Sequence, residues 1–189
     1  MKKIIWIFGL PGTGKSELIK NIHEDKNNLR SILNITSDNI SYIDVSHDFS
    51  KIADEYREAY KRSKLLINKV EEFIDSPNDF LIISGNFVDI RDITENSIIS
   101  IDKKYPYIEK EIVFLNIEDY DLLYERIKKT DWFQSNYESC IQRYPRIWVD
   151  VAAKYLKDKI YDYKELGYKI IEIDTTEGYE VNDYKTNRR

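Results

Sequence analysis

A chain of 189 residues, of which 42% are hydrophobic, has the length of one ordinary domain and enough apolar residues for a single core. Its formal net charge of −5 argues against a broad electrostatic interface with nucleic acid, although a local basic groove can exist on an acidic protein. The single cysteine, Cys140, excludes an intramolecular disulfide and a cysteine-based zinc cluster.

No apolar run approaches the roughly 20 residues that a membrane-spanning helix needs. The N-terminus enters an apolar segment without a signal-peptide cleavage pattern, and no internal repeat or Pro/Gly linker divides the chain. We therefore expect one domain over residues 1–189, in a cytoplasmic protein that does not enter a membrane and needs no obligate protein partner.

Short continuous apolar runs predict the strands of a parallel sheet, because strands that are buried on both faces carry few polar residues. In chain order they are Ile4–Phe8, Ile32–Ile35, Phe80–Ser84, Glu111–Leu115 and Tyr168–Ile173. Apolar residues at helical spacing predict helices over Ser16–Asn21, residues 50–75 and residues 146–166. This alternation predicts an α/β fold of three layers, α/β/α, with a five-stranded parallel sheet whose ligands bind beyond the carboxyl ends of the strands.

The first predicted strand leads into a complete G-x-x-x-x-G-K-[ST] phosphate-binding loop. Its glycines let successive backbone N–H groups surround a phosphate, and the following helix adds the positive end of its dipole. Lys15 can reach the outer phosphates, and the Ser16 hydroxyl can ligate Mg²⁺. The motif predicts that ATP and Mg²⁺ are bound by Gly9, Pro11, Gly12, Thr13, Gly14, Lys15 and Ser16.

A carboxylate beyond the second strand can orient the hydroxyl that receives the phosphoryl group and can accept its proton. Asp38 has this place if the strand is Ile32–Ile35, and it is the first candidate for the catalytic base. Asp38 would equally suit the N-cap of a helix. If the strand is instead Ile40–Val45, Asp44 and Asp48 are the rival candidates.

The third predicted strand ends in Ser84-Gly85-Asn86, where a motor or switch ATPase would carry a carboxylate for Mg²⁺. The absence of an acid at this point of the sequence favours a kinase. Asn86 can hydrogen-bond an acceptor hydroxyl or the edge of a base, and a polar turn explains it equally well.

Arginines follow the fourth predicted strand in a segment around residues 126–146, which we interpret as a lid. Arg126 can neutralise charge that develops on the transferred phosphoryl group, and Arg143 and Arg146 can help it to clamp an anion. Alternatively, Arg126 is an exposed partner of a carboxylate on its own helix. The loop from Thr175, after the last strand, either contacts adenine through backbone groups or is a simple turn.

The opening Met1-Lys2-Lys3-Ile4-Ile5, followed by the phosphate loop, resembles the start of the bacteriophage polynucleotide kinases and their P-loop kinase relatives. The segments that resemble this family's general-base region, its substrate strand and its arginine-bearing lid are Asn34–Asp38, Ile82–Asn86 and Leu123–Arg126. The resemblance implies ATP- and Mg²⁺-dependent transfer of the γ-phosphate to a hydroxyl of a nucleoside, a nucleotide or a nucleic acid, including a modified base in phage DNA.

Two departures from that family leave the acceptor open. Gly85 stands where the family's third strand often has Asp, and Ser41 stands where an arginine commonly follows the catalytic aspartate. A small-metabolite kinase of the shikimate or gluconate type would share the phosphate loop, the aspartate and the lid arginine. A nucleotide-binding regulatory module that hydrolyses ATP poorly would need only the loop.

Overall fold

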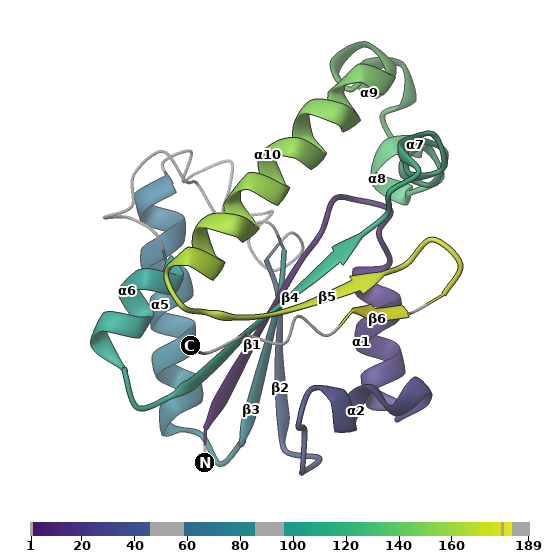
Figure 1. Cartoon of the computed structure of the whole chain (residues 1–189). Coiled ribbons are helices and arrows are strands. Elements are labelled where there is room, and N and C mark those ends of the chain that lie inside the picture. Colours follow the sequence, from purple (N-terminus) through teal and green to yellow (C-terminus); the bar gives the residue numbers. More distant parts are fainter. Residues whose placement is uncertain (1, 46–58, 86–96, 179, 183–189) are drawn as a thin grey trace. The chain divides into compact units, whose positions relative to one another are not determined.

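The computed structural model describes residues 2–45, 59–85, 97–178 and 180–182. The chain forms two compact units, Met1–Ile7 with Ser31–Ile112 and Phe8–Arg30 with Val113–Arg189, and each is described by itself. The described strands belong to one six-stranded sheet with the order β2-β3-β1-β4-β5-β6 (Figure 1). Strands β1 (Lys3–Phe8) and β4 (Glu109–Asn116) each pass from one unit into the other.

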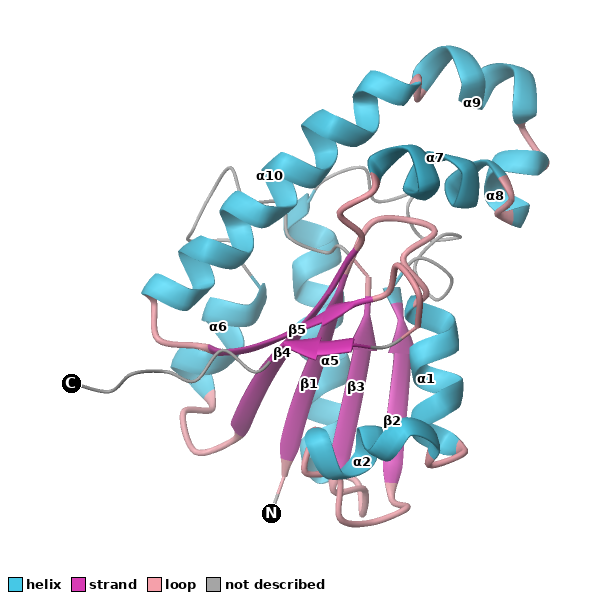
Figure 2. Ribbon diagram, turned by 45° about the vertical axis from the view of Figure 1, so that its right-hand side comes forward, coloured by secondary structure: helices cyan, strands magenta, loops and turns pink. Residues whose placement is uncertain are grey.

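The first unit contains three neighbouring parallel strands, which Figure 2 shows side by side. Strand β3 (Phe80–Ser84) lies between β1 and β2 (Ile40–Asp44). Lys3, Phe80 and Ile40 are in register at the amino ends, and Ile7, Ser84 and Asp44 are in register at the carboxyl ends. Every residue of β1 and β3 is buried, as the apolar runs predict.

A buried charge holds the amino end of β1 in the first unit. Lys3 is 2% exposed, and its ammonium donates to the carbonyl of Leu33 over 2.8 Å. It also lies 3.1 Å from Glu109 and pairs with the fully buried Glu111. Because a buried ammonium needs such partners, this contact holds Leu33 beside the start of the strand.

The predicted strand Ile32–Ile35 is wrong. Helix α2 (Leu29–Ile32) occupies its start, and Leu33 uses its carbonyl for Lys3. The second strand is β2, which lies at the edge of the sheet and has a mixed pattern of burial. An edge strand has a neighbour on one side alone, so polar residues are tolerated in it and the apolar signal is weak.

Helices α5 (Ala59–Asp75) and α6 (Ser97–Lys104) belong to the first unit and pack against each other. Helix α5 buries Leu66, Val70 and Phe73 at helical spacing. It falls within the helix predicted over residues 50–75, of which residues 50–58 lie outside the described part of the chain.

The second unit contains the four helices α7 to α10, which lie between β4 and β5 in the sequence, and the last two strands (Figure 1). Helix α10 (Arg146–Glu165) packs against α7 (Tyr120–Lys128) and β5 (Lys169–Asp174). Strand β6, which was not predicted, pairs antiparallel with β5 over three residues. The elements, in chain order after the phosphate loop, are α1 (Lys15–His23), η1 (Lys26–Asn28), α7 (Tyr120–Lys128), α8 (Asp131–Gln134), α9 (Tyr137–Arg143), α10 (Arg146–Glu165), β5 (Lys169–Asp174) and β6 (Glu180–Asn182).

The predicted α/β class is confirmed, because five strands of the sheet are parallel and helices accompany them. None of the described helices is both long and apolar enough to cross a membrane. That residues 1–189 form one domain with a lid around residues 126–146 stays a prediction.

Candidate functional site

The phosphate loop of the second unit has a backbone that requires glycine. Gly12 and Gly14 have φ values of 81° and 89°, in the left-handed region that side chains disfavour. A Cβ atom at Gly9 would lie 2.4 Å from the Thr13 hydroxyl, and one at Gly12 would lie 3.0 Å from the amide nitrogen of Ile127. Gly9 and Gly12 therefore allow the close approach of neighbouring groups, and Gly12 and Gly14 allow the left-handed backbone.

Hydrogen bonds within the loop close it on itself. The hydroxyl of Thr13 donates to the carbonyl of Leu10 over 2.8 Å, and its amide reaches the same oxygen over 3.3 Å. The ammonium of Lys15 donates to the carbonyls of Gly9 and Leu10 over 2.7 and 2.9 Å. These contacts hold the positive charge of Lys15 at the carbonyls of Gly9 and Leu10, at the start of the loop.

Helix α1 begins at Lys15 with Gly14 as its N-cap. Gly14 has no side chain that could accept from the amides of the first turn, so these amides keep the partial positive charge of a helix N-terminus. The side chain of Ser16 is exposed in the same turn. Such an arrangement binds phosphate oxygens.

The residues of the loop fit a polyphosphate that carries Mg²⁺. Among the described residues, no group of three or more His, Cys, Asp or Glu side chains could hold a metal ion alone. Mg²⁺ typically takes one or two protein oxygens and completes its coordination with phosphate and water. Ser16 could therefore supply a protein ligand if the nucleotide supplies the phosphate oxygens.

Arg126 lies near the end of α7 and holds the segment that follows β5. Its Nη1 donates to the carbonyl of Thr175 and its Nη2 to that of Thr176, each over 2.7 Å. The planar guanidinium thus bonds two successive carbonyls at once. Arg126 is not the exposed partner of a helix carboxylate, and its role in phosphoryl transfer stays a prediction.

Arg146 joins the start of α10 to α7. Its Nε lies 2.6 Å from Asp121, and its Nη1 lies 2.8 Å from Asp150. The hydrogen bonds that Arg146 donates to Asp150 and Asp121 raise the pKa of Arg146 above its ordinary value. Arg143 is exposed at the end of α9. Arg126 and Arg146 therefore bind different partners in this structure.

The position of β2 changes the choice among the candidate aspartates of the first unit. Asp38 is exposed and precedes the amino end of β2, so the argument that it follows a strand is wrong. Asp44 ends β2 in register with Ser84 and accepts from the hydroxyl of Tyr42 over 3.2 Å. Asp44 therefore has the carboxyl-end position that the sequence analysis assigned to Asp38.

The carboxyl ends of β1, β2 and β3 lie together in the first unit. The amide of Gly85 donates to Ile7 over 3.1 Å, and a Cβ atom at Gly85 would come within 2.9 Å of Val45. The phosphate loop begins two residues after Ile7 in the sequence. The rival base Asp48 and the substrate candidate Asn86 lie outside the described residues.

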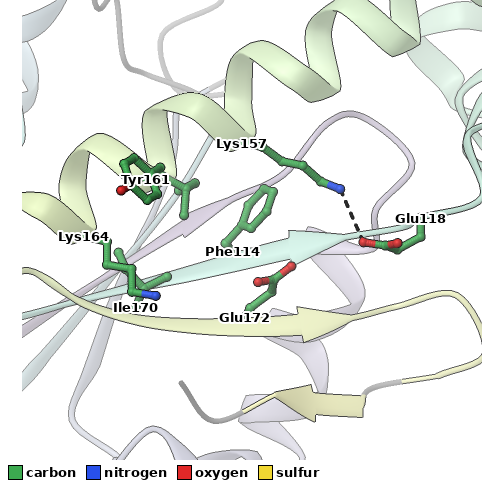
Figure 3. A pocket seen from close by; sticks show the side chains of 8 residues that line it. Phe114, Glu118, Lys157, Tyr161, Lys164, Ile170 and Glu172 are labelled. Atoms are coloured by element: carbon green, nitrogen blue, oxygen red, sulfur yellow. Dashed lines mark hydrogen bonds and ion pairs between the residues drawn. The ribbon is translucent and has the colours of Figure 1, made fainter. Parts of the chain in front are cut away.

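A pocket of about 270 Å³ lies in the second unit between α10 and strands β4 and β5 (Figure 3). Its walls combine apolar and charged side chains, and Lys157 pairs with Glu118 across 3.4 Å. No residue of the phosphate loop lines it. The lining residues are Phe114, Glu118, Lys157, Ile160, Tyr161, Lys164, Ile170 and Glu172.

One buried side chain that no motif signals also contacts the phosphate loop. The hydroxyl of Thr175 lies 2.9 Å from the carbonyl of Thr13, although the two residues are far apart in the sequence. From the sequence, only the backbone after β5 is a candidate contact, with adenine. A threonine that follows a strand has many ordinary explanations, so its sequence position carries no signal of this contact.

Two solved structures of shikimate kinase resemble this structure. The enzyme from Bacteroides thetaiotaomicron has a TM-score of 0.52 at 18% identity, over 92% of this chain and 86% of that chain. The enzyme from Acinetobacter baumannii, in complex with shikimate, has a TM-score of 0.50 at 13% identity, over 91% of this chain and 84% of that chain. No family model and no curated protein sequence matches the chain. The likeness shows that the chain has the α/β fold of these two enzymes.

Replacing Arg126 by lysine tests whether its guanidinium acts by holding the carbonyls of Thr175 and Thr176. Lysine keeps the charge but cannot bond both carbonyls at once, so Thr175, whose hydroxyl bonds the phosphate loop, is held less firmly. We expect the dissociation constant of Mg·ATP to rise about tenfold, which corresponds to about 1.4 kcal/mol. Isothermal titration calorimetry measures this change. Arg143→Lys, an exposed position, is the control. A large fall in turnover with unchanged ATP affinity would favour a role at the transferred phosphoryl group instead.

Proposed function

We propose that the protein is an ATP- and Mg²⁺-dependent phosphotransferase that moves the γ-phosphate to a hydroxyl group. The observation that carries this proposal is the phosphate loop, in which left-handed glycines, an N-terminal helix turn, Lys15 and Ser16 occur within eight residues. The kinase-like fold supports this proposal. The use of ATP as the phosphoryl donor and the identity of the acceptor are proposed with it.

The loop and Lys15 would hold the phosphates by charge and hydrogen bonds. In the proposed reaction the acceptor oxygen bonds the γ-phosphorus, the bond from that phosphorus to the β–γ bridging oxygen breaks, and ADP leaves. Mg²⁺, when bound, neutralises phosphate charge. The proton of the acceptor hydroxyl passes to a carboxylate, for which Asp44 at the end of β2 is the candidate.

The acceptor that we propose first is a hydroxyl of a nucleoside, a nucleotide or a nucleic acid. The reason is that the phosphate loop and the strand before it resemble those of the bacteriophage polynucleotide kinases. The second candidate is a small hydroxylated metabolite. The fold likeness to two shikimate kinases over more than nine-tenths of this chain favours that second candidate. A non-catalytic nucleotide-binding module would bind ATP without transfer to any acceptor.

An acceptor screen tests the proposed function. The protein is incubated with Mg²⁺ and γ-labelled ATP together with nucleosides, nucleotides, 5′-hydroxyl single-stranded DNA, shikimate or gluconate. We expect label on one class of hydroxyl, and we expect Lys15→Ala to abolish that transfer because it removes the ammonium that would contact the phosphates. Transfer at the wild-type rate by Lys15→Ala would contradict the role of the loop. ATP binding without transfer would favour the non-catalytic module.

Replacing Asp44 by asparagine tests the proposed base. Asparagine keeps the size and the hydrogen-bonding capacity but does not accept the proton, so turnover should fall by about a hundredfold or more while ATP affinity barely changes. Steady-state rates on the acceptor found in the screen measure the effect. Asp38→Asn, at the amino end of β2, should keep near-normal turnover. Loss of turnover in Asp38→Asn but not in Asp44→Asn would reverse the assignment.

A further inference from the structure

Thr175 is a buried hydrogen-bonding centre immediately after β5. It is 5% exposed, and its amide donates to the carbonyl of Asn116 over 3.0 Å. Its own carbonyl accepts from Arg126, and its hydroxyl lies 2.9 Å from the carbonyl of Thr13 and 3.3 Å from that of Asn116. Through these bonds one residue joins the phosphate loop, the end of β4 and helix α7.

The hydroxyl of Thr175 makes its better hydrogen bond with the carbonyl of Thr13, not with that of Asn116. A hydroxyl has one proton to donate, and the distance to Thr13 is the shorter of the two. The carbonyl of Asn116 already accepts the amide of Thr175. The side chain therefore contributes a specific restraint on one carbonyl of the phosphate loop.

Restraining that carbonyl sets the direction of the next amide. The peptide group that links Thr13 to Gly14 is planar and trans, so its N–H points opposite to its C=O. With the carbonyl held toward Thr175, the N–H of Gly14 points away from Thr175. Gly14 has a φ of 89° and, as a glycine, tolerates either sign of φ, so its own conformational preference restrains this peptide little.

We infer that Thr175 is a positioning residue for phosphate binding, whose hydroxyl fixes the Thr13–Gly14 peptide so that the Gly14 amide is directed at the bound phosphate. The inference rests on the proposed function, because it requires that the loop binds a nucleotide. Thr175 acts through the backbone of the loop and does not itself touch the phosphate. Its loss should therefore weaken binding of phosphate groups and leave binding of the nucleoside part unchanged.

The test compares Thr175→Val with Thr175→Ser. Valine has nearly the shape of threonine but no hydroxyl, and serine keeps the hydroxyl. Calorimetric titrations use Mg·ADP, magnesium pyrophosphate and adenosine, with thermal unfolding as a check on the fold. We expect Thr175→Val to weaken binding of Mg·ADP and pyrophosphate about tenfold, as for one lost hydrogen bond, with adenosine unaffected and with recovery in Thr175→Ser.

Thr176→Val is the matched control. Arg126 bonds the backbone carbonyl of Thr176, and the substitution keeps that carbonyl. It should bind as the wild type does. If Thr175→Val does not fold, Thr175→Ala takes its place with the same expected loss. Normal pyrophosphate binding by the folded valine or alanine variant, or an equal loss in Thr175→Ser, would overturn the inference alone. Absence of Mg·ADP and pyrophosphate binding by the wild type would overturn the proposed function and the inference together.

Discussion

The conformation of the phosphate loop is the constraint on which the proposed chemistry depends. Gly12 and Gly14 both have a left-handed backbone conformation. Holding a glycine in one conformation costs conformational entropy, and contacts of the loop must offset this cost. Some of these bonds come from the loop, through Thr13 and Lys15. Another comes from the hydroxyl of Thr175, after β5. Distant parts of the sequence therefore determine the geometry of a motif that looks local.

Arg126 and Thr175 belong to the same set of contacts in the second unit. The guanidinium of Arg126 binds the carbonyl of Thr175, and the hydroxyl of Thr175 binds the loop. A Cβ atom at Gly12 would approach the backbone of Arg126 and Ile127, so the end of helix α7 also packs on the loop. If the loop binds a nucleotide as proposed, these backbone contacts would couple Arg126 and Ile127 to that binding, in addition to any direct contact of an arginine with phosphate.

The sequence predicts best the elements that depend on local signals. Strand β3 has the predicted bounds because all its residues are apolar or small and buried. Strand β2 was misplaced because Leu33 and Ile35 are buried without belonging to a strand, whereas the true edge strand contains Ser41 and an exposed Tyr42. Strand β6 has three residues, too few for a periodic pattern. The contacts of Thr175 and Arg126 join distant segments, and no spacing in one sequence reveals them.

A crystal structure with Mg²⁺ and a non-hydrolysable ATP analogue would show directly whether residues 9–16 bind the phosphates of a nucleotide. We expect the β-phosphate to accept hydrogen bonds from the amides of residues 12–16 and Mg²⁺ to contact the Ser16 hydroxyl. A nucleotide bound elsewhere, with no phosphate in contact with these amides, would contradict it.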